Sequence, residues 1–300
     1  MEKIQLNGKE YSYVCGYRDD ETLRNSFNRL TMAVFGFDLS DWYSAGLWTD
    51  SYVPHSLTDG SDVVANVSAN LIDFDINGET RRLVQLGTVM TDETCRSRGL
   101  ARYLMERVIE TYCGSCDFIY LFANSGVTDL YPKFGFKAVK EYRYVKGITP
   151  DEDNPGIIKL NMKGKGERKI VADTVKRSLP HSPLAMKGNI PLVLYHCCSV
   201  KHDSVFYVKD SDAVIIADFN ENVMYLDAVY SPKRIDLDEV IAAAASKSAA
   251  TRVRLGFTPE KNEGWEIQED EDRDTALFIL GNGGDFIEEQ RLRFPELSHA

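Results

Sequence analysis

The sequence predicts an α/β (α+β) fold in which helices flank a β-sheet. Three observations predict it: an antiparallel meander of strands, an amphipathic helix directly after the meander, and an apolar run of strand length after that helix. A similar order of elements returns in the second half, which predicts a second, smaller α/β domain. The length of 300 residues is sufficient for two domains.

Periodicity and turn signals locate the elements of the first half. Asp59-Gly60 and Asn77-Gly78 are hairpin signals that divide the meander into three strands. The apolar run Phe118–Ala123 suits a central strand buried on both faces. The other expected strands are Tyr11–Cys15, Tyr52–Thr58, Asp62–Asp73, Arg81–Met90 and Phe136–Val145, and the expected helices are Thr22–Phe35, Leu39–Leu47, Leu100–Tyr112 and Val127–Tyr131.

A segment rich in Pro, Gly and acidic residues, Gly147–Gly156, is the candidate linker, so we expect domains at 1–150 and 151–300. The boundary could lie anywhere from about 147 to 163, because strand Ile158–Met162 could close the first sheet or open the second. Meander, helix and strand then recur in order, which favours a diverged duplication. The later elements are helix Arg168–Ser178, strands Leu192–Cys198, Ser204–Val208, Ala213–Phe219 and Val223–Tyr230, helix Leu237–Ser246, and strands Thr251–Phe257 and Thr275–Leu280.

Composition and charge exclude several classes of function. The formal net charge of −11 argues against a nucleic-acid partner and is compatible with a cationic substrate. No apolar run is long enough to span a membrane, and the N-terminus lacks the features of a signal peptide, so a cytoplasmic location is expected. Cys113 and Cys116 form a CxxC after a helix, where ordinary loop cysteines are favoured over a redox or metal site.

An arginine-bearing loop leads from the third strand of the meander into the amphipathic helix, and its core is Arg96-x-x-Gly99-x-Ala101. Backbone N–H groups at a helix N-terminus have no intrahelical partner, and the helix dipole adds positive potential there. Gly99 lets the backbone approach a ligand without a Cβ atom, while Arg96 and Arg98 offer charge-assisted hydrogen bonds. The loop therefore favours a pyrophosphate ligand over a plain surface turn.

These residues resemble the GNAT (Gcn5-related) N-acetyltransferase family, whose Arg/Gln-x-x-Gly-x-Gly/Ala loop holds the coenzyme A pyrophosphate. Arg96, Gly99 and Ala101 fall on its three defining positions, and the resemblance covers roughly residues 15 to 145. It implies a mixed, strongly twisted sheet split into a V, acetyl-CoA as cofactor, direct transfer in a ternary complex, and no metal. Asp92-Glu93 departs from the His-Pro or similar pair of many members and puts two acids near the expected polyanion.

A second block, Ala123-Asn124 followed by Tyr131-Pro132-Lys133-Phe134-Gly135-Phe136, resembles the part of that family where the cofactor's thioester lies between splayed strands. The resemblance implies that Tyr131 donates a proton to the leaving thiolate, and the alternative is a core aromatic before a helix-stopping proline. Asn124 either bonds the pantetheine or caps the following helix. The full set of expected cofactor-binding residues is Val89, Met90, Thr91, Arg96, Ser97, Arg98, Gly99, Leu100, Ala101 and Asn124.

The function implied is N-acetyl transfer from acetyl-CoA to a primary amine of a small molecule or peptide. A non-catalytic acyl-CoA-binding or sensor protein is the first alternative, and a structural module that keeps only the fold is the second. A longer acyl donor or a hydroxyl acceptor also stays open. No general base is singled out, although His55, Asp73 and Asp75 are candidates.

Acceptor choice is expected to depend on Tyr17–Trp48, where Trp42, Tyr43 and Trp48 could flank an amine by cation–π contact or simply pack together. The second half has no glycine in the corresponding loop, Ser231–Leu237, and is expected to have lost cofactor binding. One active site per chain follows. Larger relatives such as the Eis-like acetyltransferases use extra domains to shape the acceptor pocket or to assemble oligomers, so a homo-oligomer stays open.

Overall fold

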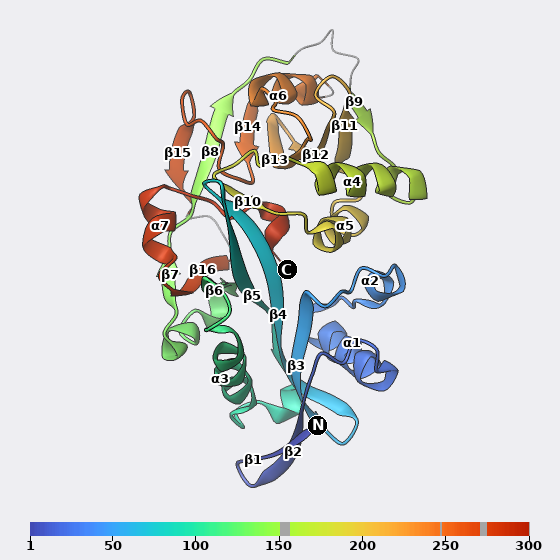
Figure 1. Ribbon diagram of the computed structural model, residues 1–300, viewed down its shortest axis with the longest axis vertical. Helices are drawn as coiled ribbons and strands as arrows, with labels where there is room; N and C mark the ends of the chain where they lie inside the picture. The colour runs from blue at the N-terminus through green and yellow to red at the C-terminus, as the bar shows by residue number, and fades with distance from the viewer. Residues whose placement is uncertain (151–156, 247, 271–274, 300) are drawn as a thin grey trace. The chain divides into compact units, whose positions relative to one another are not determined.

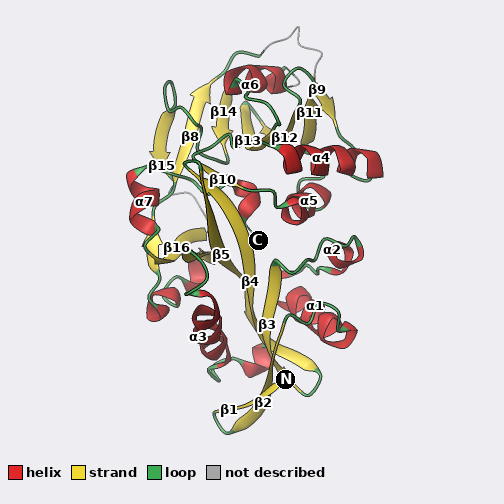
Figure 2. Ribbon diagram, in the orientation of Figure 1, coloured by secondary structure: helices red, strands yellow, loops and turns green. Residues whose placement is uncertain are grey.

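A computed structural model describes residues 1–150, 157–246, 248–270 and 275–299, and the chain divides into two compact units (Figure 1). Both units are α/β, with helices against mixed sheets, as predicted (Figure 2). The division into domains 1–150 and 151–300 stays a prediction, and the compact units differ from it in short exchanged segments. The first unit is Met1–Ile72, Arg82–Ala138 and Asp274–Gly284, and the second is Asp73–Arg81, Val139–Arg273 and Asp285–Ala300.

The first sheet has the strand order β1-β2-β3-β4-β5-β6-β16-β7, with β10 paired to the far end of β4. Its predicted meander is confirmed as β3, β4 and β5. The strands of this sheet are β1 (Glu2–Leu6), β2 (Lys9–Cys15), β3 (Tyr52–Asp59), β4 (Asp62–Ile76), β5 (Glu79–Thr91), β6 (Phe118–Asn124), β7 (Lys137–Val139), β10 (Leu184–Met186) and β16 (Thr275–Gly281). The helices of the first unit are α1 (Glu21–Phe35), α2 (Ser40–Ser44) and α3 (Leu100–Tyr112). Its 3-10 turns are η1 (Glu93–Cys95), η2 (Ser125–Val127) and η3 (Tyr131–Phe134).

β5 and β6 run parallel, joined by helix α3, and their pairing is short. The parallel register runs from Leu83 opposite Phe118 to Gln85 opposite Tyr120. Both strands continue beyond this point, β5 to Thr91 and β6 to Asn124. The strands therefore diverge as the expected V, with the end of β5 beside the loop into α3.

The core of the first unit lies between α3 and one face of the sheet, while α1 and α2 lie on the other side (Figure 1). Leu104, Met105 and Val108 recur at helical spacing on α3 and are fully buried. Fully burying such a side chain stabilises the fold by about 2 kcal/mol. This packing fixes the direction of α3, and with it the position of its N-terminus.

The second unit has the strand order β15-β8-β14-β13-β12-β11-β9, in which β13 and β14 are parallel and joined by helix α6. The predicted return of meander, helix and strand is confirmed as β11, β12, β13, α6 and β14. The elements are β8 (Tyr142–Gly147), β9 (Ile157–Lys159), α4 (Lys165–Arg177), α5 (Ile190–Cys198), β11 (Val205–Val208), β12 (Ala213–Asn220), β13 (Val223–Tyr230), α6 (Leu237–Ala245), β14 (Arg252–Leu255), β15 (Glu266–Glu269), α7 (Gly284–Glu289) and the 3-10 turn η4 (Glu296–Ser298).

Two predicted elements in the second half are corrected. The apolar run Leu192–Cys198 is not a strand but most of helix α5, which begins with an Asn189 side-chain cap and Pro191 in its first turn. A short continuous apolar run suits a buried helix as well as a strand. The strand predicted at Thr275–Leu280 is present as β16, but it belongs to the first sheet, between β6 and β7.

Two further corrections fall between the halves. The single strand predicted over Phe136–Val145 is divided into β7 and β8, which lie in different sheets. The helix predicted over Val127–Tyr131 is replaced by the 3-10 turns η2 and η3, and Pro132 lies inside η3 because proline is tolerated in a first turn. The linker predicted at Gly147–Gly156 begins with the last residue of β8, and its part 151–156 lies outside the described residues.

Four short elements, β1, β10, β15 and α7, carry no clear sequence pattern and were not predicted. In the described part of the chain, no helix is both long and apolar enough to cross a membrane.

Candidate active site

The predicted pyrophosphate loop connects β5 to α3 through the turn η1. Asp92 caps η1, where its Oδ1 accepts hydrogen bonds from the Thr94 N–H at 2.9 Å and the Thr94 hydroxyl at 2.6 Å. These bonds hold the pKa of the Asp92 carboxyl below its usual value. One of the two acids that depart from the family pattern is therefore a local capping group.

The backbone before α3 is left-handed at Ser97, with φ 62°, and at Gly99, with φ 80°. Gly99 is the N-cap residue and has no side chain to occupy the helix end. The first intrahelical bond runs from the Tyr103 N–H to the Gly99 carbonyl at 3.0 Å. The N–H groups of Leu100 and Ala101 precede it, so this helix end can offer backbone donors to an anion.

A pocket of about 630 Å³ opens at this helix end. Most of the predicted cofactor-binding residues line it together with Tyr131, and Val34, Cys95, Val127 and Leu130 complete its apolar walls, which the sequence did not reveal. The predicted residues that line it are Val89, Met90, Thr91, Arg96, Ser97, Gly99, Leu100 and Ala101. The structure thus brings the strand end, the loop and the tyrosine to one concave surface.

Arg98 and Asn124 do not line this pocket. The Arg98 guanidinium turns back to the Thr94 carbonyl, with Nη2 at 2.8 Å, and faces a neighbouring hollow beside Lys9 and Asp59. Asn124 is exposed at the end of β6, and its side chain does not cap η2. A cofactor contact at either residue stays a prediction.

Tyr131 begins η3 and is only 5% exposed. Its ring packs against Phe136 and against Phe278 of β16, with ring centroids 6.2 and 5.7 Å apart. Burial raises the pKa of the Tyr131 phenol above its ordinary value, so the hydroxyl stays protonated at neutral pH. The buried Tyr131 side chain is thus part of the pocket wall.

A buried hydrogen-bond network adjoins the pocket on β5. Thr88, one residue before Val89, has a left-handed backbone with φ 43°, and its carbonyl accepts a hydrogen bond from Asn66 Nδ2 at 3.0 Å. The Thr88 hydroxyl donates to Ser68 Oγ at 2.7 Å and contacts the Tyr52 hydroxyl at 2.9 Å. The network fixes the bend of β5 at the mouth of the V. The sequence did not indicate this network.

The predicted candidate base His55 is 2% exposed, and both ring nitrogens are engaged. Nδ1 lies 2.6 Å from the Tyr13 hydroxyl and Nε2 lies 3.1 Å from the Tyr112 hydroxyl. Burial, with a contribution from the Arg107 charge, lowers its pKa to about 4. His55 is a neutral side chain on the α3 side of the sheet rather than a base.

The two other candidate bases lie outside the first unit. Asp73 and Asp75 fall in the segment of β4 assigned to the second unit, and Asp75 Oδ1 accepts a hydrogen bond from the Gly78 N–H at 2.9 Å. That bond makes Asp75 part of the hairpin turn. Neither residue is among those that line the pocket.

The aromatic residues of Tyr17–Trp48 pack on one another. Trp42 stacks on Trp48 with ring centroids 6.1 Å apart, and the Trp48 indole donates a hydrogen bond to the Tyr52 carbonyl at 3.2 Å. The Arg24 guanidinium lies 3.7 Å from the ring centroid of Tyr43. Trp48 therefore packs against neighbouring aromatic residues, and Arg24 of the same chain already covers one face of the Tyr43 ring.

The corresponding helix end in the second unit is closed. α6 is capped by Asp236, whose carboxylate accepts from the Asp238 N–H at 2.9 Å, and its first turn contains Asp238 and Glu239. Acidic groups at a helix N-terminus satisfy its donors and repel an anion. This agrees with the expectation that the second unit does not hold a pyrophosphate.

Comparison with known proteins gives the same class of fold as the sequence predicted. Residues 20–139 match the family model described as an acetyltransferase (GNAT) domain. A GCN5-related N-acetyltransferase from Kribbella flavida is 14% identical with a TM-score of 0.56, and 90% of this chain matches 71% of that one. Eis1 from Mycobacterium abscessus is 13% identical with a TM-score of 0.54, and 89% of this chain matches 73% of that one. No curated protein matches the sequence.

The chain thus shares the fold of GNAT acetyltransferases, and its loop lies within the residues that match the family model. Residues 20–139, which contain the loop and Tyr131, are the part of the chain that matches this family model.

Proposed function

We propose that the chain is an N-acetyltransferase that moves the acetyl group of acetyl-CoA to a primary amine by direct transfer in a ternary complex. One observation carries the proposal: the helix end at Gly99 and the Tyr131 side chain line the same pocket. A helix N-terminus with arginine beside it suits the pyrophosphate, and a buried phenol suits the thioester end.

The proposed reaction is aminolysis of the thioester. The amine nitrogen attacks the thioester carbonyl carbon, a C–N bond forms, and the C–S bond breaks. The sulfur leaves as a thiolate, which accepts a hydrogen bond and then a proton from the Tyr131 hydroxyl. The proton released by the amine passes to solvent and returns to Tyr131. A free thiol has a pKa near 8.5, below that of the phenol, so Tyr131 acts first by stabilising the thiolate.

The test is incubation with acetyl-CoA and a panel of amines, with free thiol release as the readout. Wild type is expected to release coenzyme A with at least one amine, and Tyr131→Phe to lower kcat by roughly 100-fold with coenzyme A affinity unchanged. Retained affinity shows that the variant is folded. Coenzyme A binding without release on any acceptor would instead favour a non-catalytic acyl-CoA-binding protein.

A further inference from the structure

A second pocket, of about 170 Å³, lies wholly within the second unit and plays no part in the proposed transfer. It opens where β13 and β14 part: their parallel pairing ends at Leu226 opposite Leu255, and β13 continues from Asp227 to Tyr230. The segment from Ser178 to Gly188 closes the opposite side, held by a hydrogen bond from the Leu179 N–H to the Ser231 carbonyl at 2.8 Å.

Part of the wall of this pocket is apolar and buried. Leu184, Met186, Tyr230 and Phe257 line it, and each is at most 9% exposed. An enclosed apolar space of about 150 Å³ is enough to hold a benzene ring. The pocket therefore has room for one small apolar body, and Tyr230 and Phe257 are aromatic residues of the kind that can contact a cation.

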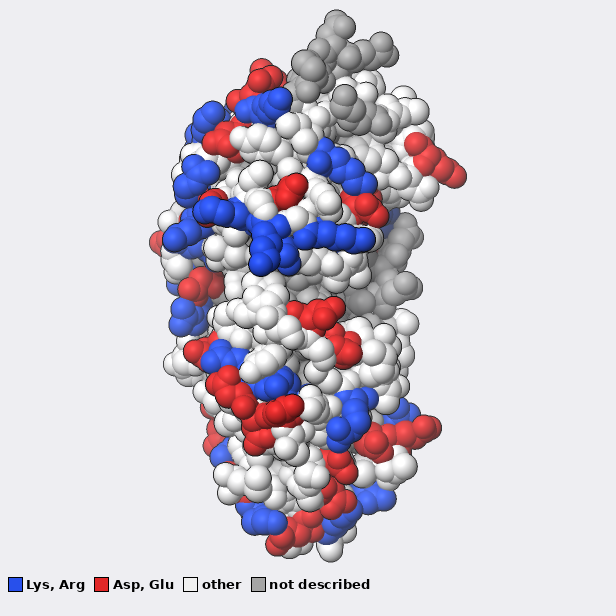
Figure 3. All heavy atoms as spheres, turned by 90° about the vertical axis from the view of Figure 1, so that its right-hand side faces the viewer, with Lys and Arg blue, Asp and Glu red and all other residues white. Residues whose placement is uncertain are grey.

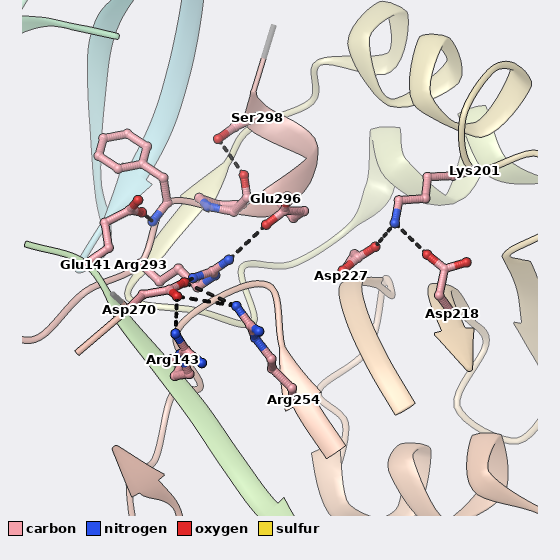
Figure 4. Close-up of polar contacts among 12 residues, drawn as sticks. Glu141, Arg143, Lys201, Asp218, Asp227, Arg254, Asp270, Arg293, Glu296 and Ser298 are labelled. Carbon is pink, nitrogen blue, oxygen red and sulfur yellow. Dashed lines mark hydrogen bonds and ion pairs between the residues drawn. The ribbon is translucent and has the colours of Figure 1, made fainter. Parts of the chain in front are cut away.

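A buried carboxylate, Asp227, lies in the same pocket and is 7% exposed. Lys201 Nζ lies 2.6 Å from Asp227 Oδ2 and 2.5 Å from Asp218 Oδ2 (Figure 4). Within the described residues, Lys201 is the one ion-pair or hydrogen-bond partner of the Asp227 side chain, whereas Asp218 also accepts a hydrogen bond from Ser204. Two carboxylates thus share one ammonium group, which leaves one negative charge.

The remaining charges near Asp227 do not neutralise it. Glu296, from the C-terminal segment, adds negative potential and is itself paired with Arg293 at 3.0 Å (Figure 4). Lys176 and Lys187 line the pocket but are exposed, and solvent and salt screen exposed charges. Burial, outweighing the attraction of Lys201, raises the pKa of Asp227 to about 6.

We propose that this pocket binds a small organic monocation, an amine or quaternary ammonium with an apolar body of about benzyl size. Its charged head would pair with Asp227 and its body would lie against Leu184, Met186 and Phe257. This ligand is opposite in charge to coenzyme A.

Benzylamine and benzyl alcohol are matched probes, because they differ in charge and hardly in size. Titrations are followed by the methyl signals of methionine, where Met186 reports this pocket and Met90 reports the cofactor pocket of the first unit. Benzylamine is expected to shift the Met186 signal with a Kd of about 0.1–1 mM, and benzyl alcohol to bind at least tenfold more weakly.

Asp227→Asn should weaken benzylamine binding at least tenfold, whereas Asp218→Asn, the matched loss of the other carboxylate on Lys201, should change it less than threefold. Equal affinity for the alcohol and the amine in wild type would overturn the proposal without need of any variant. So would a shift confined to Met90, or no shift at all. None of these readouts depends on acetyl transfer.

Discussion

At the scale of single residues, the two arginines of the pyrophosphate loop have different surroundings. Arg96 lines the pocket at the N-terminus of α3, whereas Arg98 bonds the Thr94 carbonyl and points to another hollow. Their spacing in the sequence predicted the same role for both arginines. The conformation of the loop decides which of the two side chains faces a ligand, and the local sequence does not determine that conformation.

Arg96→Ala is expected to weaken coenzyme A binding about tenfold, or ~1.4 kcal/mol, through loss of an exposed charge-assisted contact. Arg98→Ala is the matched control and should weaken it less than threefold. Calorimetric titration of both variants measures this difference, and equal losses would mean that both guanidinium groups reach the pyrophosphate.

His55 predicts a pH dependence of stability. Its pKa is about 4 in the folded chain and near 6.5 when unfolded, so the unfolded state binds more protons between these values. Stability therefore falls as pH falls through this window, by about 2 kcal/mol at pH 5. Urea unfolding of wild type and His55→Gln at pH 7.5 and 5.0 measures it.

His181 and His196 of the second unit also have lowered pKa values. The contribution of His55 is therefore obtained from the difference in stability loss between wild type and His55→Gln. His55→Gln should lose less stability on acidification than wild type does. An identical loss in both proteins would show that the folded His55 is as easily protonated as the unfolded one.

At the scale of elements, β16 completes the first sheet from the far end of the sequence. It pairs with β6 from Thr275 opposite Asn124 to Gly281 opposite Phe118, and its Phe278 contacts the Tyr131 ring. Gly283 follows β16 where an added Cβ would lie 2.5 Å from the Phe118 ring. The V of the cofactor site thus depends on a strand outside the predicted first domain.

A fragment of residues 1–150 should therefore fail to fold as a soluble monomer, because β6 would present an open hydrophobic edge. Joining residues 275–284 to it through a flexible Gly/Ser linker should restore solubility and coenzyme A binding. Gel filtration and calorimetry of the two fragments test this, and a monomeric 1–150 fragment that binds coenzyme A would contradict the role given to β16.

Local patterns predicted elements better than their partners. The meander could be predicted because Asp59-Gly60 and Asn77-Gly78 mark its turns. The helix end at Gly99 could be predicted because the backbone conformation there requires a glycine. The pairing of β16 with β6 joins residues about 150 apart, and no local signal encodes it. Asn66 and Ser68 of β4 are fully buried in the Thr88 network, which the sequence did not indicate.

At the scale of the whole molecule, two units share an order of elements and differ in one helix end. α3 begins at an uncapped glycine, and α6 begins at Asp236 with two further acids in its first turn. Acidic and basic side chains are interspersed on the face shown in Figure 3, so the net charge of −11 does not gather there into one surface. The helix end at Gly99 is therefore the feature from which we expect selectivity for an anionic cofactor.

The central claim is that this helix end, alone in the chain, binds coenzyme A. Calorimetric titration with coenzyme A should give one site per chain in wild type, and Gly99→Asp should abolish binding by placing a carboxylate at the pyrophosphate. Gly60→Asp is the matched control, since Gly60 also has a positive φ, 62°, but lies in open space on a hairpin. Two sites per chain, or unchanged affinity in Gly99→Asp, would contradict the account.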